Sequence, residues 1–462
     1  SQAQRNADIF MECAQLARLL INGSIANRAE LLCSYPQFTS AQVAEELQQQ
    51  CYEAWTHEPT AIGRIAETAR SLSDISKDPI VFGYSEWINA IEALVAGDLN
   101  SCLSLINSSE KEFLNAEQTH LSAKTQTSKL YVLGLLGRYD EAIECGLKAR
   151  EVFLRHSDLY SAGQIEHNIG NLYWRRDLYK ESEPFLSSAH SRFEQIKDER
   201  QLAMVENCQA FVKTLQNDFS VAESLYNVAL ERAIRNDLKV TAAEIETGLS
   251  NLYLFKGQYD LALEFLERSR QKYDDLTMPL QSAGCDLEIA DIYLELNLLP
   301  EALQRYDLCI SEFTVLGGQA ELARSYLGRA RTLQRLGHSD KVRENLDTAQ
   351  ELFENEENSV AVGSVRFARA QEMLNSGFLE SADEEISVAL RMFEEGANIR
   401  LALFARWLRC EIYFASGHSE GLEAELADIL AEAMDSREVQ YLCLVLLGRI
   451  TREPKYFISA VE

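Results

Sequence analysis

The chain has 462 residues, of which 46% are hydrophobic and 25% are charged, the balance of an ordinary globular protein. Its 44 basic and 72 acidic residues give a net charge of −28, which repels phosphate backbones and anionic lipid heads. No stretch approaches the roughly 18 uninterrupted apolar residues of a membrane span. From the negative charge and the lack of such a span, we expect a protein that binds neither nucleic acid nor membrane.

Ten cysteines are scattered along the sequence without any Cys-x-x-Cys pair. Cys102, Cys309 and Cys410 stand at positions that, in other copies of the repeat described below, carry alanine or another small residue. At such positions a cysteine acts as a small apolar side chain. Such usage is typical of reduced thiols rather than of a disulfide framework. The expected location is therefore cytoplasmic, and we expect no metal and no cofactor.

The first 75 residues predict a helical leader followed by a degenerate capping repeat. Residues 1–32 show the apolar periodicity of one or two helices, interrupted at Gly23. Thr39 then opens a segment with a capping-box-like start, which leads into the degenerate repeat over 39–75.

From residue 76 to residue 434 the chain repeats a unit of 40 residues. Glycine, asparagine and aspartate enter the left-handed backbone region at the lowest cost, so a residue of this kind is expected between two helices. Such hinge residues recur without insertion or deletion at Gly97, Gly137, Asp177, Asn217, Gly257, Asn297, Gly337, Gly377 and Gly417. The sequence therefore predicts nine repeats.

Each repeat is expected to hold a first helix before its hinge and a second helix after it. The first helices are predicted near 79–96, 119–136, 158–176, 199–216, 238–256, 279–296, 319–336, 359–376 and 398–416. The second helices are predicted near 98–115, 139–155, 179–196, 219–235, 259–275, 299–315, 339–354, 379–395 and 419–434.

Fixed offsets from the hinge carry particular residue types. Small residues recur five after the hinge, as at Ala262, and seven before it, as at Ser250. Tyrosines lie four before it in several repeats, and an aromatic residue lies sixteen after it in most. These offsets resemble the tetratricopeptide pattern, whose usual unit has ~34 residues. A HEAT-type array has a similar period, but the tyrosine and small-residue offsets favour an all-α, right-handed superhelical solenoid of tetratricopeptide-like helix pairs.

Residues 435–462 begin a further repeat or an exit helix. A helix is expected over 439–449, then a turn at Pro454 and the start of another helix that reaches no end signal. Since solenoids normally close with a polar capping element, we expect an effector domain to lie beyond Glu462.

Catalytic motifs are missing from the sequence. It has no Gly-x-x-x-x-Gly-Lys-Ser/Thr loop, no Gly-x-Ser-x-Gly elbow and no His-Glu-x-x-His pair, and its seven histidines are dispersed. The expectation is a protein that is not an enzyme.

The candidate binding residues lie on the first helices, whose inner face lines the groove of a tetratricopeptide superhelix. Groove-facing positions are expected 13, 10, 6 and 3 residues before the hinge, and in one repeat two before it. They carry amides that can donate to and accept from a peptide backbone, with aromatic and charged neighbours. These candidates are Gln164, His167, Asn171, Trp174, Arg175, Asn207, Phe211 and Asn251. The alternative is that the asparagines are ordinary polar residues of a helix surface.

Three arginines share the same side of a later first helix, at Arg324, Arg331 and Arg335. Arginine binds carboxylates through two parallel hydrogen bonds, so the three together suit an acidic segment, either of a partner or of another part of this chain. Internal ion pairs with neighbouring glutamates are the competing interpretation.

The 40-residue unit, with its Gly-x-Tyr-x-x-Ala hinges, resembles the long repeats of bacterial signalling regulators. These include the repeat arms of CHAT-type caspase-like peptidase proteins and the repeat domain of maltose-regulator-type activators. Residues 27–36 look like the leader of many CHAT proteins, and residues 456–462 are similar to the helix that joins such an array to its peptidase domain.

The CHAT resemblance implies a sensing arm whose catalytic domain is not in this chain, so no residue here inherits a catalytic role. The maltose-type resemblance implies an inducer-binding repeat domain that works with separate ATPase and DNA-binding domains. A free-standing adaptor is a third possibility. The sensing arm and the adaptor share the expectation of a protein or peptide partner held in the concave groove, whereas the maltose-type resemblance implies an inducer site there.

Overall fold

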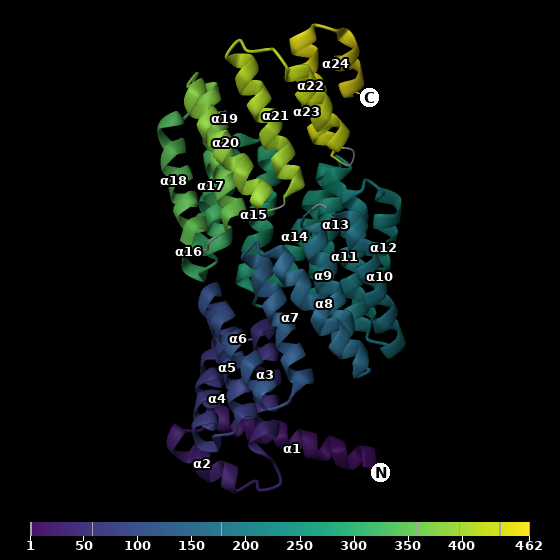
Figure 1. Ribbon diagram of the computed structural model, residues 1–462, viewed down its shortest axis with the longest axis vertical. Coiled ribbons are helices and arrows are strands. Elements are labelled where there is room, and N and C mark those ends of the chain that lie inside the picture. The colour runs from purple at the N-terminus through teal and green to yellow at the C-terminus, as the bar shows by residue number, and fades with distance from the viewer. Residues whose placement is uncertain are drawn as a thin grey trace. The chain divides into compact units, whose positions relative to one another are not determined.

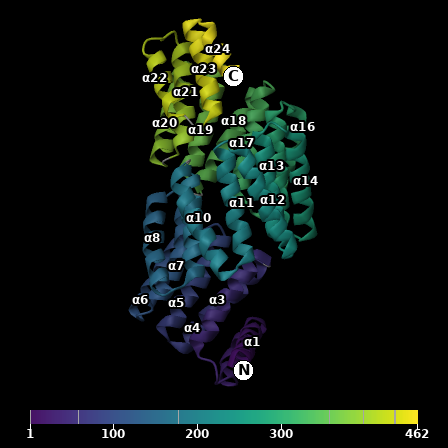
Figure 2. The ribbon, with the colours of Figure 1, turned by 90° about the vertical axis from the view of Figure 1, so that its right-hand side faces the viewer.

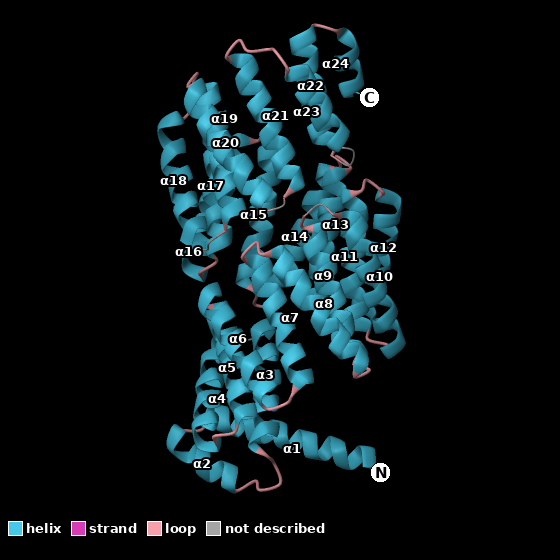
Figure 3. Cartoon of the chain, viewed as in Figure 1, coloured by secondary structure: helices cyan, strands magenta, loops and turns pink. Residues whose placement is uncertain are grey.

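The structure is a computed structural model that describes residues 2–57, 59–176, 178–355, 358–396, 398–433 and 436–461. Over these residues it consists of 24 α-helices and one short 3₁₀ turn, Pro59–Ala61, with no strand (Figure 3). None of these helices is both long and apolar enough to cross a bilayer. The all-α repeat solenoid expected from the sequence is confirmed.

The chain divides into two compact units, residues 1–168 and residues 169–462, with the division inside helix α9, Leu159–Trp174. The other helices of unit 1 are α1 Gln2–Asn22, α2 Ile25–Cys33, α3 Ser40–His57, α4 Ile62–Ser76, α5 Pro79–Val95, α6 Leu99–Asn115, α7 Thr119–Leu135 and α8 Tyr139–Arg155. Those of unit 2 are α10 Tyr179–Ile196, α11 Glu199–Leu215, α12 Phe219–Arg235, α13 Lys239–Phe255, α14 Tyr259–Asp275, α15 Pro279–Glu295, α16 Leu299–Leu316, α17 Gln319–Arg335, α18 Ser339–Asn355, α19 Ser359–Asn375, α20 Leu379–Glu395, α21 Ile399–Ala415, α22 Leu422–Glu432, α23 Arg437–Thr451 and α24 Pro454–Val461.

The leader forms helices α1 and α2, and the degenerate repeat forms α3 and α4. At the start of α3 the Thr39 amide donates to Gln42 Oε1 at 2.9 Å, and the Gln42 amide donates to Thr39 Oγ1 at 3.2 Å. This reciprocal pair is the capping box that the sequence predicts at this position.

The hinge residues adopt the left-handed conformation that their residue types favour. Eight of the nine have φ between +58° and +82°, and the ninth, Asp177, lies outside the described residues. At the hinge between α13 and α14, the Gln258 amide donates to the Tyr253 carbonyl at 2.8 Å and the Gly257 amide donates to the Leu254 carbonyl at 2.9 Å. These two bonds form a Schellman motif, which ends α13 and turns the chain into α14.

A second ladder of left-handed residues connects each second helix to the next first helix. Its members are also 40 residues apart, at Lys77, Glu117, Ser157, Lys197, Asp237, Thr277 and Gly317. The same hydrogen bonds close these turns: the Gln118 amide donates to the Phe113 carbonyl at 2.7 Å, and the Glu117 amide donates to the Leu114 carbonyl at 3.0 Å. Sequence analysis missed this ladder because most of its residues are not typical of the left-handed region.

The helices stack as successive pairs within each unit (Figures 1 and 2). Small side chains let the paired helices approach closely: Ala262 is fully buried, and Ser269 Oγ of α14 donates to the Ala243 carbonyl of α13 at 2.9 Å. The aromatic residues sixteen after the hinge fill the space between pairs, and Phe193 and Phe313 are completely buried.

The two helices of a repeat belong to different layers. In unit 2, first helices of consecutive repeats pack against each other, as α11 does on α13 and α17 on α19, whereas consecutive second helices make at most marginal contacts. The first helices of consecutive repeats are therefore more closely spaced than the second helices and form the inner layer of this unit. They are the helices that carry the candidate binding residues.

Cys309 provides a test of this packing. Its side chain is fully buried in α16, and burial raises the pKa of its thiol to about 12. Because the thiolate is the reactive form, native protein should label at Cys309 much more slowly than at Cys33, which is exposed. Mass spectrometry after a brief thiol-reagent pulse measures both rates, and equal labelling of the two cysteines in native protein would contradict the packing.

Candidate functional site

Candidate amide and aromatic side chains lie on three successive first helices that belong wholly or in part to unit 2. Asn171, Trp174 and Arg175 lie at the end of α9, Asn207 and Phe211 lie on α11, and Asn251 lies on α13. We call these six residues the amide–aromatic cluster. All belong to unit 2, and all were candidates from the sequence.

Trp174 is the centre of the contacts within this cluster. Its indole Nε1 donates to Asn171 Oδ1 at 3.0 Å, and its ring meets the Phe211 ring edge to face, with centroids 4.9 Å apart. The Arg175 guanidinium lies over the indole, 5.8 Å from its centroid. These contacts hold the indole and the Asn171 carboxamide in one arrangement, so a partner would meet a largely preformed surface.

Asn207, on α11, has a buried side-chain oxygen. Its Oδ1 has no hydrogen-bond donor among the described residues. Gly248 permits this position, because a Cβ atom on Gly248 would lie 2.9 Å from Asn207 Oδ1 and 2.5 Å from the Tyr226 ring. A buried acceptor without a donor costs free energy.

Asn251 is partly buried, and its carboxamide forms no hydrogen bond to other described residues. Thr247, one turn earlier on α13, is different: its hydroxyl lies 2.9 Å from Ser269 Oγ and is used inside the helix pair. The α13 contribution to the cluster is therefore the single asparagine.

The two candidates that fall in unit 1 are His167 and Gln164. His167 is buried, and burial lowers its pKa to about 4, so it is neutral at physiological pH and is not presented to a ligand. Trp87 and Leu287 occupy the same position ten before the hinge and are also buried, whereas Asn207 at this position is only partly buried. Gln164 donates to the Tyr160 hydroxyl at 3.0 Å.

The three arginines of α17 are not three free cations. Arg324 donates to Glu288 at 3.0 Å and to Asp291 at 3.3 Å, both on α15. Arg335 donates to the Leu294 carbonyl at 2.6 Å. Arg331 is exposed, and its charge favours the ionised form of Asp291, although burial raises the pKa of that carboxyl overall. For Arg324, the structure therefore shows the internal ion pairs that were the competing interpretation.

Sequence analysis missed a set of buried carboxylates eleven residues before the hinge. We call this set the buried carboxylate ladder: Glu166, Glu206, Glu246 and Asp286. A charge buried in this way is expensive unless it is paired. The signal was present in the sequence, because the same 40-residue step that gives the hinges also connects these four residues.

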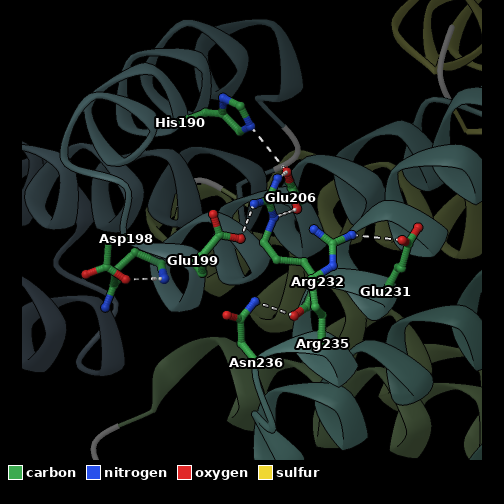
Figure 4. A network of polar contacts seen from close by, with 9 residues as sticks. His190, Asp198, Glu199, Glu206, Glu231, Arg232, Arg235 and Asn236 are labelled. Carbon is green, nitrogen blue, oxygen red and sulfur yellow. Dashed lines mark hydrogen bonds and ion pairs between the residues drawn. The ribbon is translucent and has the colours of Figure 1, made fainter.

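Each carboxylate of the ladder has basic partners on a neighbouring second helix. Around Glu206, Arg232 donates from Nε and from Nη2 at 3.0 Å each, and His190 Nε2 lies 3.4 Å away (Figure 4). Burial alone would raise the pKa of Glu206, but the hydrogen bonds from His190 and Arg232 hold it below its ordinary value. Glu246 is paired with Arg268 at 2.5 Å and with Lys272.

The charges at this position are reversed in the later repeats. Arg366 and Arg406 stand eleven before their hinges, and each donates to a glutamate eight after the hinge: Arg366 to Glu385 at 2.9 Å and Arg406 to Glu425 at 2.8 Å. In the earlier repeat, the same two positions hold Asp286 and Arg305, which are paired with the opposite polarity.

The repeat of α15 and α16 also holds one carboxylate, Glu312, at a position where two other repeats hold a basic residue. Fifteen after the hinge, Arg232 and Lys272 face the ladder in two repeats, but the equivalent residue of α16 is Glu312. One oxygen of Glu312 is buried without a hydrogen-bond partner in the described part of the chain. Burial, and then the negative charges of Asp286 and Asp274, raise its pKa.

None of these clusters has the composition of a metal centre. Among the described residues, no group of three or more histidines, cysteines, aspartates and glutamates is placed to hold a metal ion. The ladder carboxylates are directed at arginine and lysine inside the helix packing, so this arrangement supports packing.

Solved helical-repeat structures are similar to this chain. A Rap protein complexed with competence and sporulation factor aligns with a TM-score of 0.52 and 12% sequence identity, over 85% of this chain and 99% of that chain. The fold is that of a tetratricopeptide-type repeat array. No protein-family model matches the sequence, and no curated protein matches it.

Two further tetratricopeptide-type likenesses are weaker. The apo form of the quorum sensor NprR from B. thuringiensis aligns with a TM-score of 0.49 and 17% identity, over 76% of this chain and 98% of that chain. A signal transduction ATPase with numerous domains and a tetratricopeptide repeat sensor, from Pyrococcus horikoshii, aligns with a TM-score of 0.46 and 14% identity over 84% of this chain. The chain spans 54% of the length of that ATPase.

Proposed function

We propose that this tetratricopeptide-type array is a binding scaffold that holds an extended peptide or protein segment against the amide–aromatic cluster of unit 2. The observation that carries the proposal is the partly buried Trp174 indole, which donates to Asn171 Oδ1 at 3.0 Å and meets the Phe211 ring with centroids 4.9 Å apart. The peptide backbone supplies N–H donors, and its side chains would pack against the rings.

The role is recognition rather than catalysis. Each side chain of the cluster that bears hydrogen-bonding groups is an amide, an indole or a guanidinium, and none of these is a general base or nucleophile at neutral pH. The Rap protein with the similar fold was solved with a bound factor, which is compatible with binding to this kind of array.

The proposal is tested with a peptide selected for binding to the wild-type protein from a random library. Replacing Asn171 and Asn251 together by alanine should weaken its binding on the order of 10- to 100-fold, because each lost amide contact is worth about 1 kcal/mol. Calorimetric titration measures the affinity, and the melting curve should change little because both side chains are only partly buried.

Asn227 provides the matched control, because it is an exposed asparagine on the second helix α12. The Asn227→Ala variant should bind the peptide like wild type. Wild-type affinity in the Asn171→Ala, Asn251→Ala double variant would remove the cluster as the binding site.

A narrower proposal makes this scaffold the regulatory arm of a bacterial CHAT-type protease system. It is supported by the repeat pattern and the short leader and exit resemblances in the sequence. Occupancy of the groove would then have to favour one of two states of the array, since a ligand shifts an equilibrium only through different affinities. The encoding reading frame tests it: a following segment of alternating strands and helices with a late cysteine supports the protease arm, and a stop codon directly after Glu462 favours an adaptor.

A further inference from the structure

A cavity of about 580 Å³ lies away from the amide–aromatic cluster, between α18 and α19 and at the start of α20. One wall is apolar and consists of Val342, Leu346, Met373 and Phe378. The Phe378 side chain is 66% exposed. The cavity is within the size range of small-molecule sites.

The equivalent clefts of two other repeats are closed by paired side chains. Between α10 and α11, Lys213 Nζ donates to Glu183 at 2.5 Å. Between α12 and α13, the Tyr253 hydroxyl donates to Glu223 at 3.0 Å. Both pairs join the residue six after one hinge to the residue four before the next.

Arg343 and Met373 occupy these two positions at the cavity between α18 and α19. A thioether cannot pair with a guanidinium as a carboxylate does, so these two positions form no bridge here. The two positions that are bridged in those two repeats are therefore not bridged to each other at this cavity.

The same substitution leaves an arginine without a partner. Arg343 is exposed and forms no ion pair or side-chain hydrogen bond with another described residue. The second arginine of the cavity, Arg369, is already held by Asp347 and Gln350, each at 2.8 Å. Arg343 is therefore the cation available to a ligand.

Two carboxylates, Asp340 and Glu372, also line the cavity. They make it unsuitable for a multiply charged anion such as a phosphate, because the repulsion would grow with each added charge. A single carboxylate attached to an apolar body fits both features.

We propose that this cavity binds a small monocarboxylate with an apolar body. Arg343 receives the carboxylate through paired N–H donors. Met373 and Phe378 cover the apolar body, so that its binding removes exposed aromatic surface from water.

Three probes with the same phenyl body separate the charges of the ligand: 3-phenylpropanoate, phenylalanine and 2-phenylethylamine. Binding is followed by saturation-transfer NMR and calorimetric titration on the full chain. The carboxylate probe should bind and the amine should not, while binding of phenylalanine as well would place the ligand among amino acids. Absence of binding by both carboxylate probes, or tighter binding of the amine, would overturn the proposal.

Two variants locate the site. Arg343→Gln should weaken 3-phenylpropanoate binding about tenfold or more, because a charge-assisted bidentate contact is lost. Met373→Tyr places in the cavity the residue found at this position in four other repeats, and should abolish binding while the melting temperature stays the same or rises. Arg391→Gln, at an exposed arginine of α20, is the control and should bind like wild type. Unchanged binding in Arg343→Gln and Met373→Tyr would show that the probe binds elsewhere.

Discussion

Replacing Glu246 by alanine is expected to lower the free energy of unfolding by about 3 kcal/mol. The Glu246 side chain is completely buried and accepts hydrogen bonds from Arg268 and Lys272 of α14. Removing one partner of a buried pair costs about 3–5 kcal/mol, and the lower end applies because Arg268 and Lys272 are 47% and 35% exposed and can regain water.

Glu144 is the matched control for this experiment. It pairs with Lys148 one turn away at 2.7 Å, but both side chains are more than two-thirds exposed. Glu144→Ala should therefore change stability by no more than about 0.5 kcal/mol.

Urea unfolding measures both variants, and hydrogen exchange shows where the loss occurs. Since repeats are stabilised mainly by their neighbours, amides of α13 and α14 should lose protection first in Glu246→Ala. Equal urea midpoints for the two variants would show that the buried pair contributes nothing beyond a surface pair.

Replacing Glu312 by glutamine is expected to stabilise the protein at pH 7–8 by about 1–2 kcal/mol. The variant removes a partly buried charge that faces Asp286 and Asp274, and it supplies an N–H donor where a buried oxygen has no partner. The value lies in the lower part of the range for buried unsatisfied groups because Glu312 is partly exposed.

The gain should depend on pH with a definite sign. The pKa of Glu312 is raised in the folded state, so the folded protein binds this proton more readily than the unfolded chain. Its destabilising effect is fully present above the raised pKa and disappears as pH falls toward the ordinary carboxyl value of about 4.3. The stability difference between Glu312→Gln and wild type should therefore shrink from pH 8 to pH 4.

The charged groups that act on Glu312 come from three helices: Arg270 and Asp274 of α14, Asp286 of α15 and Arg305 of α16. Glu301→Gln, in the first turn of α16, is the control. The negative charge of Glu301 stabilises the N-terminus of this helix, so its removal should cause a small destabilisation. A stability gain for Glu312→Gln that is the same at pH 4 and pH 8 would refute the account.

The helix boundaries could be predicted because hinge conformation is a local property. Gly257 takes positive φ in its own right, and the helix before it, predicted at 238–256, is found at Lys239–Phe255. The second helix of the last full repeat is the least accurate, predicted at 419–434 and found at Leu422–Glu432, because a further left-handed glycine, Gly421, delays its start.

The contents of the candidate site could be predicted only in part, because they depend on how docked helices share their side chains. The positions of Asn171, Trp174, Asn207 and Asn251 on first helices follow from the hinge offsets. The burial of His167 and the pairing of Arg324 with Glu288 do not follow from these offsets. They depend on which residues of other helices pack against the first helix, and the hinge spacing does not specify those residues. The turn at Lys77 was missed for a related reason: a lysine enters the left-handed region only because the hydrogen bonds of the finished turn hold it there.

The reversed charges of the later repeats make their helix pairs electrostatically distinct from the helix pair that contains Asp286 and Arg305. All repeats have the same length, so by shape alone the second helix of one repeat could dock on the first helix of another while the chain is folding. Such an exchange between the repeat of Asp286 and that of Glu385 would bring two carboxylates together, and the complementary exchange would bring Arg366 against Arg305. Wrong partners are therefore rejected by repulsion, and repeats from the two halves of unit 2 are not interchangeable parts in an engineered array.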